Sequence, residues 1–97
     1  MAQKWISLKK SNRQEIEDGI NKEIISCYLN DENAKEFIRE WLNEQTWDVI
    51  QIIFCAGSYD TNPLIREINN VQKLDEDEKG SIKTELVDIQ LNITGMK

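Results

Sequence analysis

Apolar residues recur every three or four positions along most of the sequence, the spacing that places side chains on one face of an α-helix. In the segment 13–28 the recurring residues are Ile16, Ile20, Ile24, Cys27 and Tyr28. In the segment 32–45 they are Ala34, Phe37, Ile38, Trp41 and Leu42. In the segment 63–74 they are Leu64, Ile65, Ile68, Val71 and Leu74. Each segment is therefore predicted to form a helix whose apolar face packs against the others.

The predicted helix starts are marked by residues that commonly cap helices. The tetrapeptide 11–14, Ser-Asn-Arg-Gln, has the form of a capping box ahead of the first helix. Asp31 and Thr46 are the predicted N-caps of the next two helices, because their side-chain oxygens can accept hydrogen bonds from free backbone N–H groups. Asn62 and Pro63 predict another helix start, with proline at the first helical position.

Two further segments fit a helix and a strand almost equally well. The segment 47–56 is apolar almost all round and rich in β-branched residues, which predicts a central, buried element of either type. In the segment 84–94 apolar and polar residues alternate, as in a strand. As a helix, the segment 82–94 aligns its apolar residues on one face, follows acidic residues and ends at Gly95. We favour the helix because it explains both ends of this segment.

The sequence therefore predicts an all-α fold, a compact bundle of about five short helices. The alternative is an α+β fold with strands near 3–8, 47–55 and 84–94. A chain of 97 residues can bury one modest core, so we expect residues 1–97 to form a single domain. Residues 1–10 are expected to form a basic arm or a short strand on that domain.

Neither a membrane segment nor a reactive cysteine pair is predicted. The sequence lacks an apolar run of about 18 residues, and its first residues lack the apolar stretch of a secretory signal. We therefore expect a cytoplasmic protein without membrane contact. Cys27 and Cys55 lie among apolar neighbours at a spacing that fits no metal or redox motif, so both are expected to be small buried hydrophobic side chains.

The residues of common catalytic sites are missing from the sequence. The chain has no histidine, which removes the commonest general base and the nucleophile pairs that depend on it. Its four glycines stand alone, so they do not form a phosphate-binding loop. We therefore expect a protein that is not an enzyme and that uses no catalytic residue and no cofactor.

One motif resembles a calcium-binding loop without completing it. Counted from Asp75, the pattern has carboxylates at the first and third positions and Gly80 at the sixth, as in an EF-hand loop. Lys79 stands at the fifth position and Leu86 at the twelfth, where the metal needs oxygen ligands. We therefore expect no metal site, and we interpret the segment 75–78 as a charged connection or the acidic start of a helix.

Charge is distributed unevenly along the chain. Residues 1–13 hold four of the twelve basic residues and no acid, whereas residues 14–97 hold the other eight and all eighteen acids. The net charge of −6 thus combines a +4 arm with a −10 body. Such a body repels phosphate groups, so we expect no direct nucleic-acid binding, and it suits a protein partner with a basic surface. Negative charge that serves only solubility is the alternative.

Three groups of residues are candidates for partner binding. Four glutamates at four-residue intervals form a stripe that faces away from the apolar residues of the predicted helix 32–45: Glu32, Glu36, Glu40 and Glu44. Tyr59 and Asp60 place an aromatic ring beside a charge in a predicted turn. The third group is the acidic run Asp75, Glu76, Asp77 and Glu78. The structural alternatives are a solvated polar face, a ring that caps the core and an acidic helix start.

The composition resembles that of small acidic helical inhibitors such as the immunity proteins of nuclease colicins, although the chain lacks their recognition motif. We therefore expect an inhibitor that occludes a basic surface. It would be an immunity protein that neutralises a cognate bacterial toxin, or a phage-type blocker of a nucleic-acid-binding enzyme. One alternative is a structural or adaptor module that uses helix contacts or forms a homodimer. Another is a nucleic-acid-binding regulator that uses the basic N-terminal arm.

Overall fold

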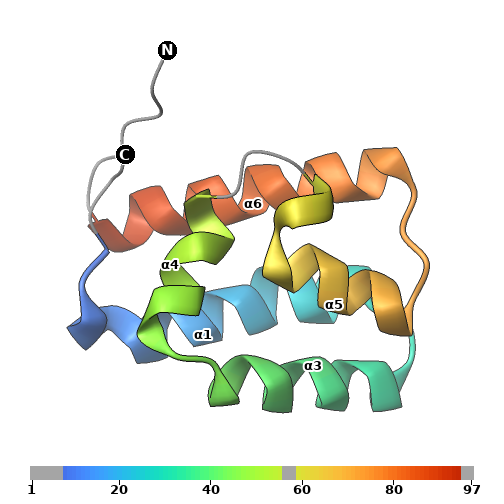
Figure 1. Ribbon diagram of the computed structural model, residues 1–97, viewed down its shortest axis with the longest axis horizontal. Helices are drawn as coiled ribbons and strands as arrows, with labels where there is room; N and C mark the ends of the chain where they lie inside the picture. Colours follow the sequence, from blue (N-terminus) through green and yellow to red (C-terminus); the bar gives the residue numbers. More distant parts are fainter. Residues whose placement is uncertain (1–7, 56–58, 95–97) are drawn as a thin grey trace.

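The computed structural model describes residues 8–55 and 59–94, which form helices joined by short connections (Figure 1). The first helical stretch comprises the 3-10 turn η1 (Lys10–Asn12), α1 (Arg13–Ile20), the π-helical turn η2 (Asn21–Ile25) and α2 (Ser26–Tyr28). The other elements are α3 (Glu32–Glu44), α4 (Trp47–Cys55), the 3-10 turn η3 (Tyr59–Thr61), α5 (Pro63–Val71) and α6 (Glu76–Thr94).

The all-α prediction is confirmed, because the described residues contain helices and no strand. The strand alternative is wrong for 47–55 and 84–94, which form α4 and the greater part of α6. Of the third candidate strand, 3–8, only Leu8 is among the described residues. The predicted basic arm 1–10 likewise lies outside them except for its last three residues, in which Leu8 is buried and both lysines are exposed.

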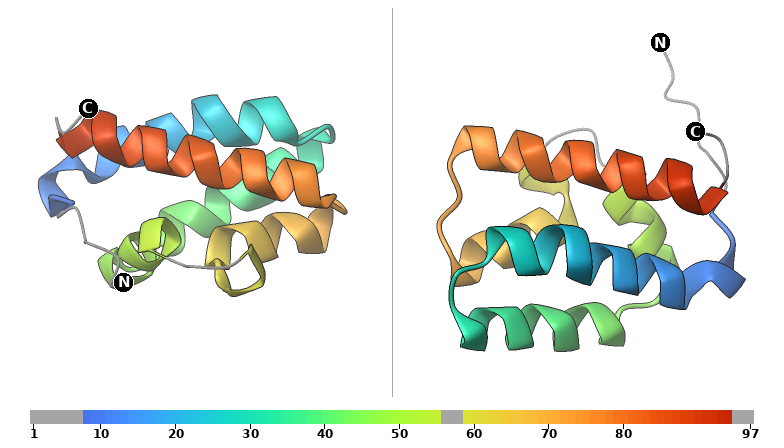
Figure 2. Two further views of the ribbon diagram at one scale, coloured as in Figure 1. Left: turned by 90° about the horizontal axis from the view of Figure 1, so that it is seen from above. Right: turned by 180° about the vertical axis from the view of Figure 1, so that it is seen from behind.

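Helices α6 and α3 lie on opposite sides of the bundle. Figure 1 shows α6 along one edge, α3 along the other, and α1, α4 and α5 between them. Seen from above in Figure 2, α6 crosses the space between α1 on one side and α4 with α5 on the other. Contacts of α6 with α1 and α4, and of α3 with α5 and η2, maintain this arrangement. The two outer helices therefore each turn a long face to solvent.

The core is built mainly from isoleucine. More than half of the buried apolar side chains among the described residues are isoleucines, and every α-helix except the three-residue α2 contributes buried side chains to one cluster. Ile16 and Ile20 from α1, Ile38 from α3 and Ile82 from α6 are completely buried. Burial of one such side chain stabilises a fold by about 1.5–3 kcal/mol. The apolar faces predicted from helical spacing therefore account for most of the core.

The first helix does not begin with the predicted capping box at 11–14. Asn12 occupies the N-cap position of α1, and no side chain makes a capping hydrogen bond there. Instead the turn η1 leads into the helix, and the backbone N–H of Asn12 donates to the carbonyl of Lys9 at 2.8 Å. The side chain of Gln14, freed from capping, donates to Asp18 at 3.0 Å.

The π-helical turn η2 changes which residues of the first helix face the core. A π turn adds one residue to the helical repeat, so the buried face beyond it shifts along the sequence. Ile25 and Leu29 are buried as a result, whereas Cys27 is exposed and its Sγ contacts the carbonyl of Lys22 at 3.4 Å. The prediction that Cys27 is buried is therefore wrong. The same prediction for Cys55 concerns a side chain outside the described part of the chain.

Three side chains assigned to the core lie at the surface. The exposed fractions are 49% for Phe37, 47% for Ile52 and 36% for Val71. On α3 the buried side chains form a narrow stripe: Ala34, Ile38 and Leu42. The stripe is narrow because α3 is an outer helix that contacts its neighbours along one side only. Ile52 likewise shows that α4 is not buried all round, contrary to the prediction for 47–56.

The other predicted helix starts are confirmed. Asp31 Oδ2 accepts from the backbone N–H three residues later at 3.0 Å, and Thr46 Oγ1 does the same at 3.4 Å. Asn62 Oδ1 accepts from the backbone N–H of Leu64 at 3.0 Å. The amide nitrogen of Asn62 also donates to the carbonyl of Ile53 at 2.7 Å, which ties the start of α5 to α4.

Candidate partner-binding site

The four glutamates of α3 are all exposed, and we call them the acidic row: Glu32, Glu36, Glu40 and Glu44. Successive helical residues are rotated by about 100°, so residues four positions apart differ by only about 40° around the axis. The centre of the acidic row consequently lies about 180° from the buried stripe of α3. The prediction that the row faces solvent is therefore confirmed.

The fold leaves much of the charge on the acidic row uncompensated. Glu32 and Glu36 pair with the basic residues three positions later, at 3.3 and 3.6 Å. Both glutamate side chains remain mostly exposed, at 83% and 65%, and exposed pairs of this kind contribute at most about 1 kcal/mol. Among the described residues, Glu40 and Glu44 have no ion-pair partner. The row therefore presents net negative charge to solvent.

An exposed aromatic ring borders the acidic row on one flank. Phe37 lies one turn before Glu40, on the side of α3 toward Trp41. About half of its surface is exposed, although Trp41 packs partly against the core. The sequence did not identify Phe37 as a surface residue, because its position at the edge of the apolar face of α3 fits both the core and the surface. Its spacing of one helical turn from Glu40 was the signal that could have placed it beside the acidic row.

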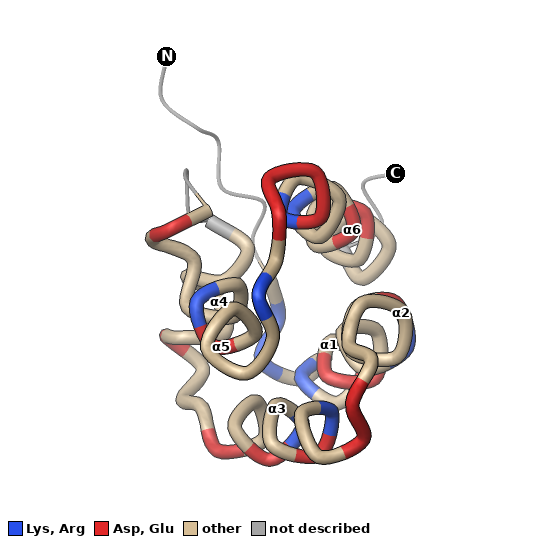
Figure 3. Tube along the Cα trace, turned by 90° about the vertical axis from the view of Figure 1, so that its right-hand side faces the viewer, with Lys and Arg blue, Asp and Glu red and all other residues tan. Residues whose placement is uncertain are grey.

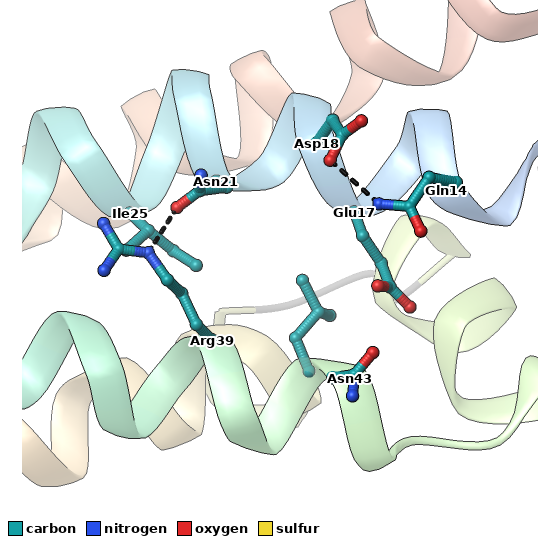
Figure 4. Close-up of a pocket in the computed structure, with 8 residues that line it drawn as sticks. Gln14, Glu17, Asp18, Asn21, Ile25, Arg39 and Asn43 are labelled. Carbon is teal, nitrogen blue, oxygen red and sulfur yellow. Dashed lines mark hydrogen bonds between the residues drawn. The ribbon is translucent and has the colours of Figure 1, made fainter.

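A groove of about 200 Å³ lies between α1 and α3 on the other flank of the acidic row (Figure 4). Its lining is mostly polar: Gln14, Glu17, Asp18, Asn21, Ile25, Arg39, Leu42 and Asn43. In Figure 4, Asn21 and Arg39 lie at one end of the groove, whereas Glu17 and Asp18 of α1 lie at the other end, across from Asn43 of α3. The groove therefore has an acidic end and a basic end. It escaped sequence analysis because two separate helices supply its walls.

Hydrogen bonds fix both ends of the groove. At the basic end, Arg39 Nε donates to Asn21 Oδ1 at 2.7 Å, which links α3 to the π-helical turn. At the acidic end, Gln14 Nε2 donates to Asp18 Oδ1 at 3.0 Å. Both bonds are drawn in Figure 4. The polar walls of the groove are therefore held by contacts within the protein.

Arg13 joins the two helices beside the groove. Its guanidinium pairs with Glu17 at 2.6 Å and donates to the carbonyls of Leu42 and Asn43 at 3.4 and 3.2 Å. These carbonyls belong to the last turn of α3, where a cation complements the helix dipole. Arg13, one of the four bases that form the +4 arm, therefore has a structural role and compensates Glu17.

Two of the acidic residues at the start of α6 cap that helix, and a third makes an ion pair. Asp75 Oδ1 accepts from the backbone N–H of Glu78 at 2.8 Å, and Glu78 Oε1 accepts from that of Asp75 at 3.3 Å. These reciprocal bonds form a capping box. Glu76 pairs with Lys79 at 3.6 Å. The interpretation as an acidic helix start is confirmed, and Gly80 lies within the helix instead of at the turn of a calcium loop.

Tyr59 and Asp60 lie against the same start of α6. Lys79 Nζ lies 3.8 Å from Asp60 Oδ1, and Lys83 Nζ lies 5.7 Å from the centre of the Tyr59 ring. A Cβ atom at Gly80 would come within 3.1 Å of the Tyr59 hydroxyl, so the glycine permits this close approach. The Tyr59 ring also packs partly against the core, which agrees with the structural alternative for this residue.

The predicted partner-binding residues thus fall into two groups on opposite sides of the molecule. Figure 3 shows acidic residues along α3 on one side and at the start of α6 on the other. The turn η3 adds Tyr59 and Asp60 to the second group, in which lysines and backbone N–H groups engage the charges. The acidic row with Phe37, which we call the α3 face, and the adjoining groove therefore form the candidate site.

The residues that the structure describes form neither a metal cluster nor a membrane-spanning helix. They bring together no three histidine, cysteine, aspartate or glutamate side chains that could hold a metal ion. Within the same ranges, no helix combines the length and apolar character needed to cross a membrane. No family model, curated protein or solved structure matches the chain. The case for a function therefore depends on the α3 face and the groove.

Proposed function

We propose that the protein is a small inhibitor that binds a cationic protein through the α3 face. One observation carries this proposal: an exposed aromatic ring borders four exposed glutamates, two of which lack an ion pair among the described residues. Aromatic side chains supply much of the binding energy when a partner covers them. Surrounding carboxylates steer a basic partner toward the ring and favour one orientation of the complex.

Helix stability accounts for only part of the acidic row, because Glu32 lies in the first turn of α3 and only Glu32 and Glu36 pair with basic residues. Like charges four positions apart on a helix repel by a few tenths of a kcal/mol for each pair. The row also lies opposite the buried stripe of α3 and supports no packing. Unpaired carboxylates that repel one another beside an exposed ring fit a surface that a partner covers.

The chemistry favours a partner that itself binds nucleic acid. Such proteins carry cationic grooves, and a rigid acidic helix can occupy one and exclude the phosphate backbone. A toxin neutralised by its immunity protein would be blocked in this way, as would a nucleic-acid enzyme bound by a phage-type inhibitor. Occlusion requires no catalytic residue and no cofactor on this chain. We expect the two proteins to meet in the cytoplasm, without membrane contact.

Two matched sets of neutralised variants test the proposal. The first replaces the row with Glu36→Gln, Glu40→Gln and Glu44→Gln. The control set replaces three exposed acids outside the α3 face and the capping bonds, by Glu15→Gln, Asp48→Asn and Asp77→Asn. Both sets change the net charge equally. A basic protein that the wild-type chain retains from its host is purified, and its affinity for each form is measured by calorimetry at low and high salt.

The α3 set should weaken binding by about 100-fold, or roughly 1 kcal/mol for each charge removed. The control set should change it by no more than a few-fold, and salt should weaken binding by the wild-type chain. Equal losses in the two sets would show that only net charge matters and would refute the α3 face. If no basic partner is found and sedimentation shows a stable homodimer that forms through Phe37, the protein is instead a structural or adaptor module.

A further inference from the structure

We propose that a basic amphipathic helix of a second protein docks on the solvent-facing side of α6. We call this surface the outer α6 face, and five of its residues line a hollow of about 360 Å³: Thr84, Glu85, Val87, Asp88 and Leu91. Among the described residues, α6 alone supplies this lining. Because α6 and α3 lie on opposite sides of the bundle (Figure 1), a helix seated here leaves the α3 face open. The inference therefore goes beyond the proposed function and does not depend on it.

The outer α6 face carries two apolar side chains that do not belong to the core cluster. The inner side of α6 supplies that cluster through Ile82, Leu86 and Ile89. At about 100° for each residue, Leu91 lies nearly opposite this inner side. Val87, one turn before Leu91, is 45% exposed. A β-branched residue is also a weak helix former, so helix stability does not explain Val87. The fold thus leaves an apolar strip on the outside of α6.

The spacing along the outer α6 face favours a helix as the occupant. Thr84, Val87 and Leu91 follow one another at steps of three and four residues. A second helix with apolar residues at the same steps can lie alongside α6 with its side chains between these residues. Helix α6 spans 19 residues and is therefore about 28 Å long, which gives a partner helix several turns of contact. An extended peptide would need the edge of a sheet, and the described residues contain no strand.

The charges beside the apolar strip favour a basic occupant. The described lining of the hollow includes the carboxylates of Glu85 and Asp88 and no lysine or arginine. Lys79 and Lys83 of α6 lie against the turn η3 instead. A second copy of the chain would bring the same acids together and carries a net charge of −6, so it is disfavoured. Lysine or arginine residues that flank the apolar stripe of a partner helix would complement these acids.

A synthetic peptide tests this inference with the full chain. The probe is a blocked peptide of about four helical turns, built from leucine and lysine, with leucine at steps of three and four residues. One matched probe has the same composition with the leucines spread around the helix. Another has glutamate in place of lysine. The labelled protein is titrated with each peptide at low salt, and the backbone amide NMR signals give the location and the affinity of binding.

Matched variants separate the outer α6 face from general stickiness. Val87→Ser removes the exposed apolar side chain, and Ile52→Ser is the control, because Ile52 of α4 is equally exposed at 47%. Valine, isoleucine and serine have similar helix propensities, so both variants should remain folded, which circular dichroism checks. Glu85→Gln removes one flanking charge at nearly constant size.

We expect saturable shifts at residues 84–91 with the amphipathic leucine–lysine peptide and none with the two matched probes. Val87→Ser should weaken binding by about fivefold and Glu85→Gln by about threefold, whereas Ile52→Ser should leave it unchanged. The absence of saturable shifts, equal binding of either matched probe, or equal losses from Val87→Ser and Ile52→Ser would overturn the inference. Shifts centred on Phe37 and Glu40 would overturn it while supporting the proposed function.

Discussion

Helix α3 and the start of α6 are both rich in acids but use them differently. At the start of α6, Asp75 and Glu78 cap the helix through reciprocal hydrogen bonds, and Glu76 pairs with Lys79. On α3 the acidic row faces solvent along the whole helix, and only Glu32 lies in the first turn, where free N–H groups stabilise carboxylates. Contacts within the fold therefore account for Asp75, Glu76 and Glu78, whereas Glu40 and Glu44 of α3 have no ion-pair partner among the described residues.

Among the helix caps, the one at the start of α5 should give the largest loss of stability when it is removed. Asn62 is almost completely buried, caps α5 and donates to the carbonyl of Ile53. Asn62→Ala should lower the free energy of unfolding by about 2–4 kcal/mol, because a cap is lost and a carbonyl loses its hydrogen bond. Guanidinium denaturation followed by circular dichroism measures this, with Asn62→Ser retaining a capping oxygen as the intermediate case. A loss smaller than that of Asp75→Ala would contradict this ranking.

The capping box of α6 should give a smaller loss. Asp75→Ala removes the acceptor for the N–H of Glu78, which should lower the free energy of unfolding by about 1 kcal/mol. Asp75→Asn should lose less, because asparagine also caps helices well. The same denaturation experiment distinguishes the two variants. Equal stability of Asp75→Ala and the wild-type chain would show that the α6 acids are as dispensable for folding as the acidic row.

The acidic row should give the smallest effect on stability and the opposite sign. The double variant Glu40→Gln and Glu44→Gln should raise the free energy of unfolding at low salt by no more than about 0.5 kcal/mol, because it relieves repulsion along the helix. Urea denaturation, which adds no ions, measures this gain at low salt, and about 1 M salt should remove it because salt screens exposed charges. A decrease in the free energy of unfolding above about 1 kcal/mol would show that the acidic row stabilises the fold, as the acids at the start of α6 do.

Much of the fold could be predicted from local signals. Asp31, Thr46 and Asn62 cap helices as their residue types indicate, because capping depends on backbone groups only a few positions away. Cys27 was misplaced because the π-helical turn shifts the buried face, and apolar spacing does not reveal such a turn. Phe37 was misplaced because the width of a buried stripe depends on how many neighbours a helix has, which only the packed bundle determines.

The candidate site was predictable only in part. The acidic row follows from residue spacing on a single helix and was found in full. The groove depends on the approach of α1 to α3, and two of its polar side chains, Asp18 and Asn43, are far apart in the sequence. Conversely, Tyr59 and Asp60 were grouped with partner-binding residues although lysines of α6 engage them. Contacts between helices thus decided which polar residues remain available to a partner.

Mapping the surface of this chain that a bound basic protein covers tests the α3 face most directly. In an NMR cross-saturation experiment, the partner is irradiated and the loss of signal is read on the backbone amides of the deuterated chain. The α3 face as partner surface predicts the strongest losses at Phe37, Glu40 and Glu44, weaker losses around Asp18 and Asn43, and none at the start of α6. Losses centred on Asp75 to Glu78, with α3 unaffected, would contradict it.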